Sequence, residues 1–123
     1  MSTIIASNVS DGTLSIPTTY VTNGSAKAWA NLNGTGTIAL RDSFNVSSLT
    51  DNGTGNYTVN LTNAMSNSDY AAFDFIEVTS STGVSSGLSG SRTASAVRLN
   101  VYNVSGVNID PDIVNFTAHG DLA

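Results

Sequence analysis

The chain is predicted to be an all-β protein, built as a small antiparallel β-sandwich or jelly-roll-like module. Charged residues make up only 11% of its 123 residues, well below the usual quarter, and Ser, Thr and Asn take their place. These short polar side chains compete for backbone hydrogen bonds, so they favour strand surfaces and turns over helices. Apolar and polar residues alternate with a period of two in several segments, and Gly/Asn turns separate those segments. One domain of this length can bury a single core.

Residues 1–25 are predicted to form an N-terminal arm of lead-in strands, ahead of a β-sandwich module at 26–123. Short strands are expected over 3–6 and 13–16 with a turn at Ser10-Asp11-Gly12, and Tyr20-Val21 would begin another strand. Pro17 interrupts this region because proline cannot donate to a strand ladder. The arm could pair within its own domain, exchange onto a neighbouring subunit, or anchor the protein to a larger assembly.

Residues 26–72 are predicted to contain three strands joined by Gly/Asn turns. The first has alternating Ala28, Ala30 and Leu32, and the third has alternating Tyr57, Val59 and Leu61. Between them, one apolar face is expected to continue through four residues: Ile38, Leu40, Phe44 and Val46. Residues 51–56 (DNGTGN) supply the Asn and Gly that a hairpin reversal needs.

Three further strands are expected over 70–79, 96–102 and 113–118. Between the first two lies the lowest-complexity stretch, 80–93 (SSTGVSSGLSGSRT), which is predicted to be an exposed loop. Such a loop is either a display surface for a host or partner, or a plain connector. The candidate display residues are its central ones: Ser86, Gly87, Leu88, Ser89 and Gly90.

No catalytic, cofactor-binding or metal-ligating residue is predicted. The single histidine, His119, precedes Asp121, but no G-x-S-x-G nucleophile elbow occurs. The acidic pair Asp74 and Glu77 would point to opposite faces of a strand, and the acidic residues at 110 and 112 flank a proline turn. A Ca²⁺ loop at 51–56 and a metal held by three copies of His119 are weaker alternatives, since the 51–56 segment lacks a later bidentate glutamate.

Three aromatic residues are candidates for an interface or a sugar contact: Trp29, Tyr57 and Tyr102. Aromatic rings with polar tips suit half-buried sites, and exposed ones can form a sugar-binding platform. For Trp29, the only tryptophan, the favoured interpretation is an anchor in the core or at a subunit interface.

Charge and patterning exclude several partners. The net charge is −5 and the four basic residues do not form a run, so no nucleic-acid binding is expected. No apolar stretch approaches the roughly 18 residues of a membrane span, and the N-terminus lacks the features of a signal peptide. We therefore expect synthesis in the cytoplasm. Because charged side chains normally prevent sheets from self-associating, their scarcity favours a homo-oligomer.

Four segments, taken in order, resemble a module of bacteriophage tail-fibre and related virion-surface proteins. They are residues 24–29 (GSAKAW), 33–37 (NGTGT), 43–48 (SFNVSS) and 51–59 (DNGTGNYTV), and the resemblance covers about residues 11–79. It implies a non-enzymatic structural protein on the surface of a tailed-phage virion, of the tail-fibre or fibre-tip type, that supports host attachment. The implied partners are two further copies in a homotrimer, other virion proteins of the tail or capsid, and a host surface glycan.

Two other functions remain open. A capsid decoration protein that stabilises the head is favoured by the short, self-contained chain. A monomeric carbohydrate-binding module would use the aromatic residues named above.

Overall fold

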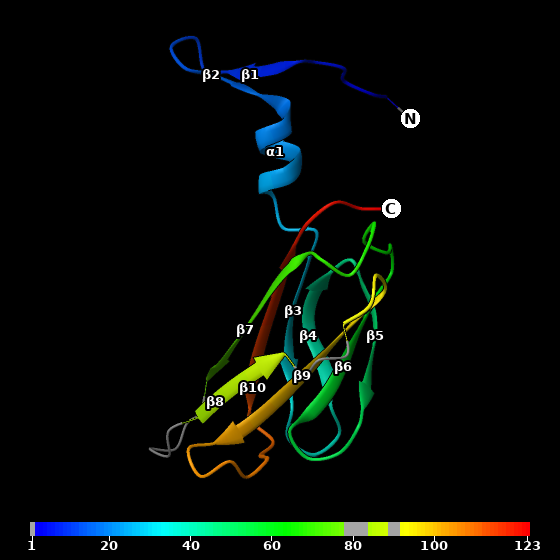
Figure 1. Ribbon diagram of the computed structural model, residues 1–123, viewed down its shortest axis with the longest axis vertical. Helices are drawn as coiled ribbons and strands as arrows, with labels where there is room; N and C mark the ends of the chain where they lie inside the picture. Colours follow the sequence, from blue (N-terminus) through cyan, green and yellow to red (C-terminus); the bar gives the residue numbers. More distant parts are fainter. Residues whose placement is uncertain (1, 78–83, 89–91) are drawn as a thin grey trace.

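Two four-stranded antiparallel sheets pack face to face as a β-sandwich, and a thin N-terminal arm extends from one end (Figure 1). The computed structural model describes residues 2–77, 84–88 and 92–123. All described strand pairs are antiparallel. The predicted all-β sandwich is therefore confirmed.

The first sheet has the strand order β4-β3-β10-β7 and the second has the order β5-β6-β9-β8. The strands of the first sheet are β3 (Ala28–Asn33), β4 (Ala39–Phe44), β7 (Ala71–Glu77) and β10 (Ile113–His119). Those of the second are β5 (Val46–Asp51), β6 (Asn56–Leu61), β8 (Val84–Leu88) and β9 (Ala96–Asn103).

The core lies between the sheets and follows the period-two pattern of the sequence. In β6, β9 and β10, every second residue is buried, as the alternation predicts. The largest fully buried side chains are Tyr57, Leu32, Met65, Leu99, Val59, Val97, Val101 and Val114.

The apolar face predicted through Ile38–Val46 is wrong as a single strand, because the chain changes sheets at Asn45. This residue has φ = 56°, a left-handed conformation that Asn tolerates better than most residues, and it separates β4 from β5. A bulge within β4 also reverses the expected face. Leu32 pairs with Leu40 but Asn31 pairs with Asp42, so Arg41 is the extra residue. Phe44 consequently points outward, whereas Leu40 packs against the core.

The prediction of one loop across 80–93 is wrong for Val84–Leu88, which form β8. This strand pairs with β9 from Val84↔Asn103 to Leu88↔Leu99. Short Ser and Gly side chains bury little surface, but ladder hydrogen bonds come from the backbone and do not require large side chains. An edge position in the sheet needs only one partner strand, and β8 has β9.

The arm consists of a small hairpin followed by a helix. β1 (Asn8–Ser10) pairs with β2 (Ser15–Pro17), around a turn in which the Asp11 carboxylate accepts the Thr13 and Leu14 amides. The predicted strand start at Tyr20-Val21 is wrong, because these residues lie in α1 (Thr18–Gly24). Pro17 is the last residue of β2 and directly precedes the helix, with φ = −58° and an extended ψ of 142°. Within the described chain, no helix has the length and apolar character needed to cross a membrane.

Candidate functional site

The outward face of the first sheet carries four exposed aromatic side chains. We call this side of the sheet the aromatic face. Phe44, Trp29, Phe73 and Phe75 are 55%, 38%, 52% and 65% exposed. Trp29 therefore is not a core residue, and that part of its interpretation is wrong. Its role as an interface residue stays a prediction.

Strand register places three of these aromatic residues in one row. Phe44 pairs with Trp29, Trp29 with Thr117, and Thr117 with Phe73. Directly opposed side chains lie about 5 Å apart at Cβ, so Phe44 and Trp29 are neighbours on this face. Strands are spaced about 4.8 Å apart, which puts the Trp29 and Phe73 backbones about 10 Å apart. The row is a largely apolar strip across all four strands.

A second row beside the first is more polar. It joins Asp42, Asn31, Asn115 and Phe75 in register. At its centre the side-chain amide of Asn31 donates a hydrogen bond to Oδ1 of Asn115, at 2.7 Å. The two rows contain one charged residue, Asp42, at the edge strand. These two rows are therefore nearly free of charge, and their polar groups can bond to each other. Glu77 lies outside the two rows, two residues beyond Phe75 on the same exposed side of β7.

Tyr57 does not belong to this face, so its prediction as an interface or sugar-contact residue is wrong. Its ring is fully buried between the sheets, and its hydroxyl donates to Asp110 Oδ1 at 2.7 Å. The same oxygen accepts the Gly55 amide at 2.7 Å, and Gly34 O lies 3.3 Å from the hydroxyl. Burial, and then the hydrogen bond and negative charge of Asp110, raise the pKa of Tyr57 well above its usual value. Tyr57 thus ties together the loops at the end of the sandwich away from the arm.

Tyr102 lies on the other sheet. It alternates with buried Leu99 and Val101 neighbours in β9 and is half-buried on the outward side. The three aromatic candidates therefore occupy different parts of the molecule: Trp29 on one outer face, Tyr102 on the other, and Tyr57 inside. They do not form a joint site.

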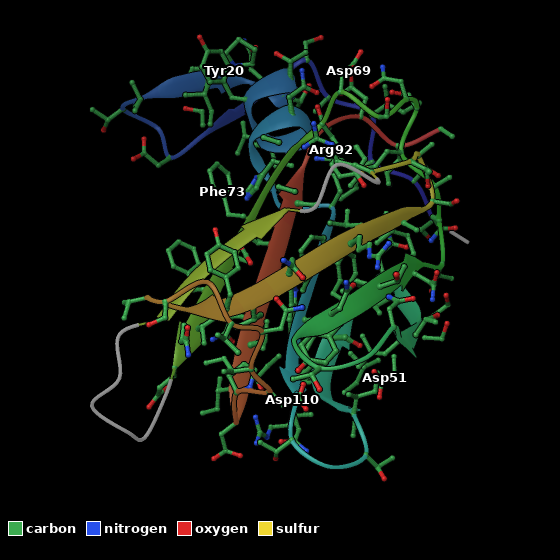
Figure 2. The ribbon with its side chains drawn as sticks, turned by 60° about the horizontal axis from the view of Figure 1, so that its bottom comes forward. Tyr20, Asp51, Asp69, Phe73, Arg92 and Asp110 are labelled. Atoms are coloured by element: carbon green, nitrogen blue, oxygen red, sulfur yellow. The ribbon has the colours of Figure 1, made fainter. Side chains whose placement is uncertain are left out.

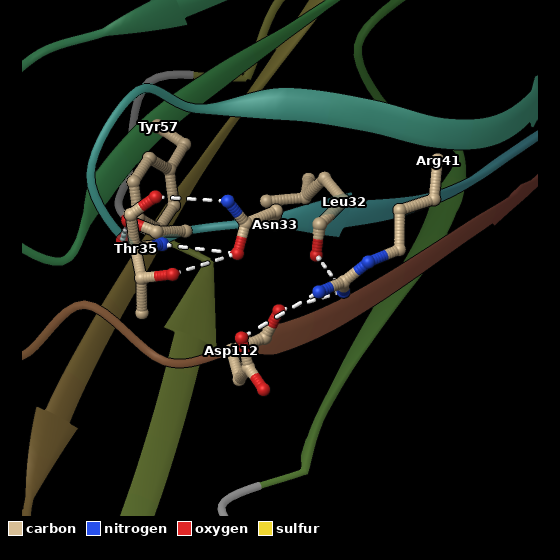
Figure 3. A network of polar contacts seen from close by, with 7 residues as sticks. Leu32, Asn33, Thr35, Arg41, Tyr57 and Asp112 are labelled. Carbon is tan, nitrogen blue, oxygen red and sulfur yellow. Dashed lines mark hydrogen bonds and ion pairs between the residues drawn. The ribbon is translucent and has the colours of Figure 1, made fainter.

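Among the acidic residues considered as catalytic pairs, one pair lies on opposite sides of a strand and a member of the other makes a structural contact. Asp112 forms an ion pair with Arg41 at 3.6 Å, and the Arg41 guanidinium also donates to the backbone oxygens of Leu32 and Asp112 (Figure 3). Asp74 is half-buried on the inner side of β7 and Glu77 is exposed on the outer side, as the spacing predicted. In the described part of the chain, no three His, Asp or Glu side chains gather as metal ligands would.

The turn at 51–56 is held by its own hydrogen bonds. Asp51 Oδ1 accepts the Gly53 amide at 2.8 Å, and the Asn52 side chain donates to Thr58 Oγ1 at 2.8 Å. Gly53 and Gly55 have positive φ. These contacts are those of the predicted Asx-type hairpin turn.

Of the five candidate display residues, three lie in β8: Ser86, Gly87 and Leu88. Ser89 and Gly90 lie outside the described residues. Pairing with β9 fixes the backbone of the first three residues, which is not the open loop that the composition indicated.

The arm is the second apolar surface of the chain. Every side chain from residue 2 to 25 is exposed except half-buried Thr18. The large apolar ones are Ile4, Ile5, Val9, Leu14, Ile16, Tyr20 and Val21. Some of these surround a hollow of about 400 Å³ between the N-terminal segment and α1, lined in part by Ile5, Val9 and Val21. In Figure 2, Phe73 lies toward the arm with its Tyr20, whereas Asp51 and Asp110 lie toward the opposite end.

Sequence reasoning missed most of the aromatic face. The alternation in β7 correctly put Phe73 and Phe75 on one side, but both sides of that strand are apolar and the pattern does not say which is outside. Phe44 was assigned inward because a one-residue bulge leaves no sequence signal in its neighbours. No family model matches the chain, and comparison with curated proteins and with solved structures gave no significant match.

Proposed function

We propose that this chain is a non-enzymatic structural protein on the surface of a tailed-bacteriophage virion. It belongs to the tail-fibre or fibre-tip type, acts as a homotrimer, and supports host attachment. The observation that carries the proposal is the arm, whose apolar side chains are exposed along its whole length. Exposed apolar surface of this extent marks a site of protein association. The order of motifs shared with virion-surface modules supplies the class of assembly.

A mechanical role also agrees with how the acidic groups are used. Asp110 accepts hydrogen bonds from Tyr57 and Gly55, and Asp112 pairs with Arg41. Both carboxylates are exposed, and these contacts use them to hold loops together. The sandwich acts as a rigid body and the arm as its attachment element.

Localising the chain on particles tests this proposal. Antibodies against the sandwich are applied to purified particles of a phage whose genome encodes the chain, and gold labels are viewed by electron microscopy. Labels at the distal tail are expected. Labels over the head would instead favour a capsid decoration protein, and particles that lack the chain would contradict a virion role altogether.

One observation favours a second function, a monomeric carbohydrate-binding module. Trp29 is exposed in a row with Phe44 and Phe73, beside the hydrogen-bonded amides of Asn31 and Asn115. Aromatic rings that stack on sugars beside amide groups are suited to glycan recognition. This function predicts saturable glycan binding that Trp29→Ala abolishes and that the control Tyr102→Ala, on the other sheet, leaves unchanged. A stable oligomer without glycan binding would contradict it.

A further inference from the structure

We propose that the aromatic face of each copy is covered by the N-terminal arm of a second copy. The inference rests on the homo-oligomer of the proposed function but not on its virion location. It names the two surfaces that meet: the aromatic face around Trp29 and Phe73, and the arm around Ile5, Val9 and Val21.

The arm requires packing against another surface to be stable. A hairpin with three residues in each strand and a helix of seven residues are each marginal in water without packing. The hydrogen bonds that hold the arm together are internal, such as the Thr18 amide to Ser7 O at 2.8 Å. They leave its apolar side chains in solvent, Ile4 and Ile5 almost completely. Burial on another surface would supply the missing stability.

Low charge indicates that the aromatic face is the surface that receives the arm. The chain has a net charge of −5, so contact at regions of low charge reduces the repulsion between two copies. Residues 1–25 contain one charged residue, Asp11, and the two rows of the aromatic face contain one, Asp42. Within the described residues, both surfaces thus combine exposed apolar side chains with little charge.

The hydrogen bonds around Lys27 indicate that the arm covering a given sheet comes from another copy. Lys27 joins α1 to β3, and its backbone amide donates to Ala118 O of β10 at 2.8 Å. Its ammonium group donates to the carbonyl oxygens of Thr22 and Ser25 at the end of α1. The side chain of Asn45 donates to Lys27 O at 2.9 Å. These bonds hold the arm extended from the end of the sandwich, as Figure 1 shows, and not folded onto its own sheet. The arm is therefore directed toward a neighbour.

Trp29 is the only tryptophan in the chain and reports directly on this contact. In the unmodified 123-residue chain we expect Trp29 fluorescence to be blue-shifted and shielded from acrylamide. Val21→Asn in the arm should shift the emission to the red, raise quenching at least twofold and reduce the mass measured by light scattering. The control Val107→Asn changes an exposed valine outside both surfaces and should leave all three unchanged. Circular dichroism checks that each variant keeps its sheets.

Cross-linking then identifies the copy, because the natural chain has no cysteine. A tagged chain with Thr22→Cys and an untagged chain with Thr117→Cys are refolded together and treated with a short bis-maleimide. We expect a covalent product of one tagged and one untagged chain. The control partner carries Asn100→Cys on the opposite sheet and should give none.

Three results would overturn the inference. A monomer with fully quenchable Trp29 would refute both the arm contact and the homo-oligomer. An oligomer with exposed Trp29, or with equal cross-linking to Thr117→Cys and Asn100→Cys, would refute the arm contact alone. A chain that carries both Thr22→Cys and Thr117→Cys and closes only on itself would show that the arm covers its own sheet.

Discussion

The side chain of Asn45 links the end of the arm to both sheets of the sandwich. Its amide donates to Lys27 O and Asn63 O, and its oxygen accepts the Asn63 backbone and side-chain amides. Its backbone makes the left-handed step from one sheet to the other. Asn45 thus helps to fix where the arm joins β3, where β4 ends and how the chain leaves β6.

Asn45→Ala should lower the free energy of unfolding by about 2–4 kcal/mol, from lost hydrogen bonds and a Cβ in the left-handed region. Asn45→Gly loses the same bonds but accepts the backbone conformation, so it should cost about 1–2 kcal/mol less. Urea denaturation of both variants measures the difference. Equal losses would show that the positive φ contributes nothing.

Tyr57 should make the protein sensitive to alkali. The pKa of its hydroxyl is raised in the folded state, chiefly by burial and also by Asp110. Above about pH 10 the unfolded chain loses the phenolic proton while the folded chain keeps it. The stability that this proton provides is complete below that pH and falls as pH rises further.

Tyr57→Phe should therefore cost about 1–3 kcal/mol at neutral pH, because Asp110 loses its hydroxyl partner. Its melting temperature should fall less than that of the natural protein between about pH 9 and pH 11. A smaller fall is expected rather than none, since burial also raises the pKa of Tyr70. Calorimetry at several pH values measures both slopes, and parallel curves would exclude Tyr57 as the alkaline group.

At the scale of elements, close packing of a turn against a neighbouring strand requires glycine at one position and not at another. Gly55 is buried with φ = 65°, and a Cβ there would collide with the backbone oxygens of Val101 and Ile109. The hairpin between β5 and β6 thereby approaches the segment after β9 without a side chain between them. Gly36 has a similar φ of 62°, yet a Cβ there would meet open space.

These two glycines form a matched pair for mutation. Gly36→Ala should cost about 1–2 kcal/mol, from the left-handed backbone alone. Gly55→Ala should cost clearly more, about 3 kcal/mol or above, because the backbone must also move. Thermal unfolding of both variants gives the comparison. Similar losses would mean that the loop beside Gly55 can shift freely.

Elements with a clear period were predictable from the sequence, and those that depend on long-range partners were not. Buried alternation placed β6, β9 and β10 closely. The edge strand β8 has little apolar pattern of its own and exists because β9 is beside it. The bulge at Arg41 depends on pairing with β3, so the outward turn of Phe44 had no local signal. The helix α1 was missed because seven residues are too few to show a helical stripe.

The whole molecule combines a well-packed sandwich with two exposed apolar surfaces. Its core residues are almost completely inaccessible, whereas the arm and the aromatic face place isoleucine, phenylalanine and tryptophan in solvent. The proposed homo-oligomer would cover both surfaces. The candidate site could be predicted only as a role for Trp29, because its other members depend on which side of each strand faces out.

Association through these surfaces should depend little on salt. Contacts between exposed charges are screened as ionic strength rises, whereas burial of apolar surface is not. We expect the oligomer to keep the same mass from about 0.05 M to about 1 M NaCl, a range over which the Debye length shortens several-fold. Dissociation at high salt would indicate an interface built from charged residues such as Arg41 and Asp42 instead.

The most direct test of the proposed homotrimer is the solution mass of the 123-residue chain, measured by light scattering on a sizing column at several concentrations. We expect a concentration-independent mass of three times 12.6 kDa. A mass of 12.6 kDa at every concentration would contradict it, because the arm and the aromatic face would then remain uncovered in solution.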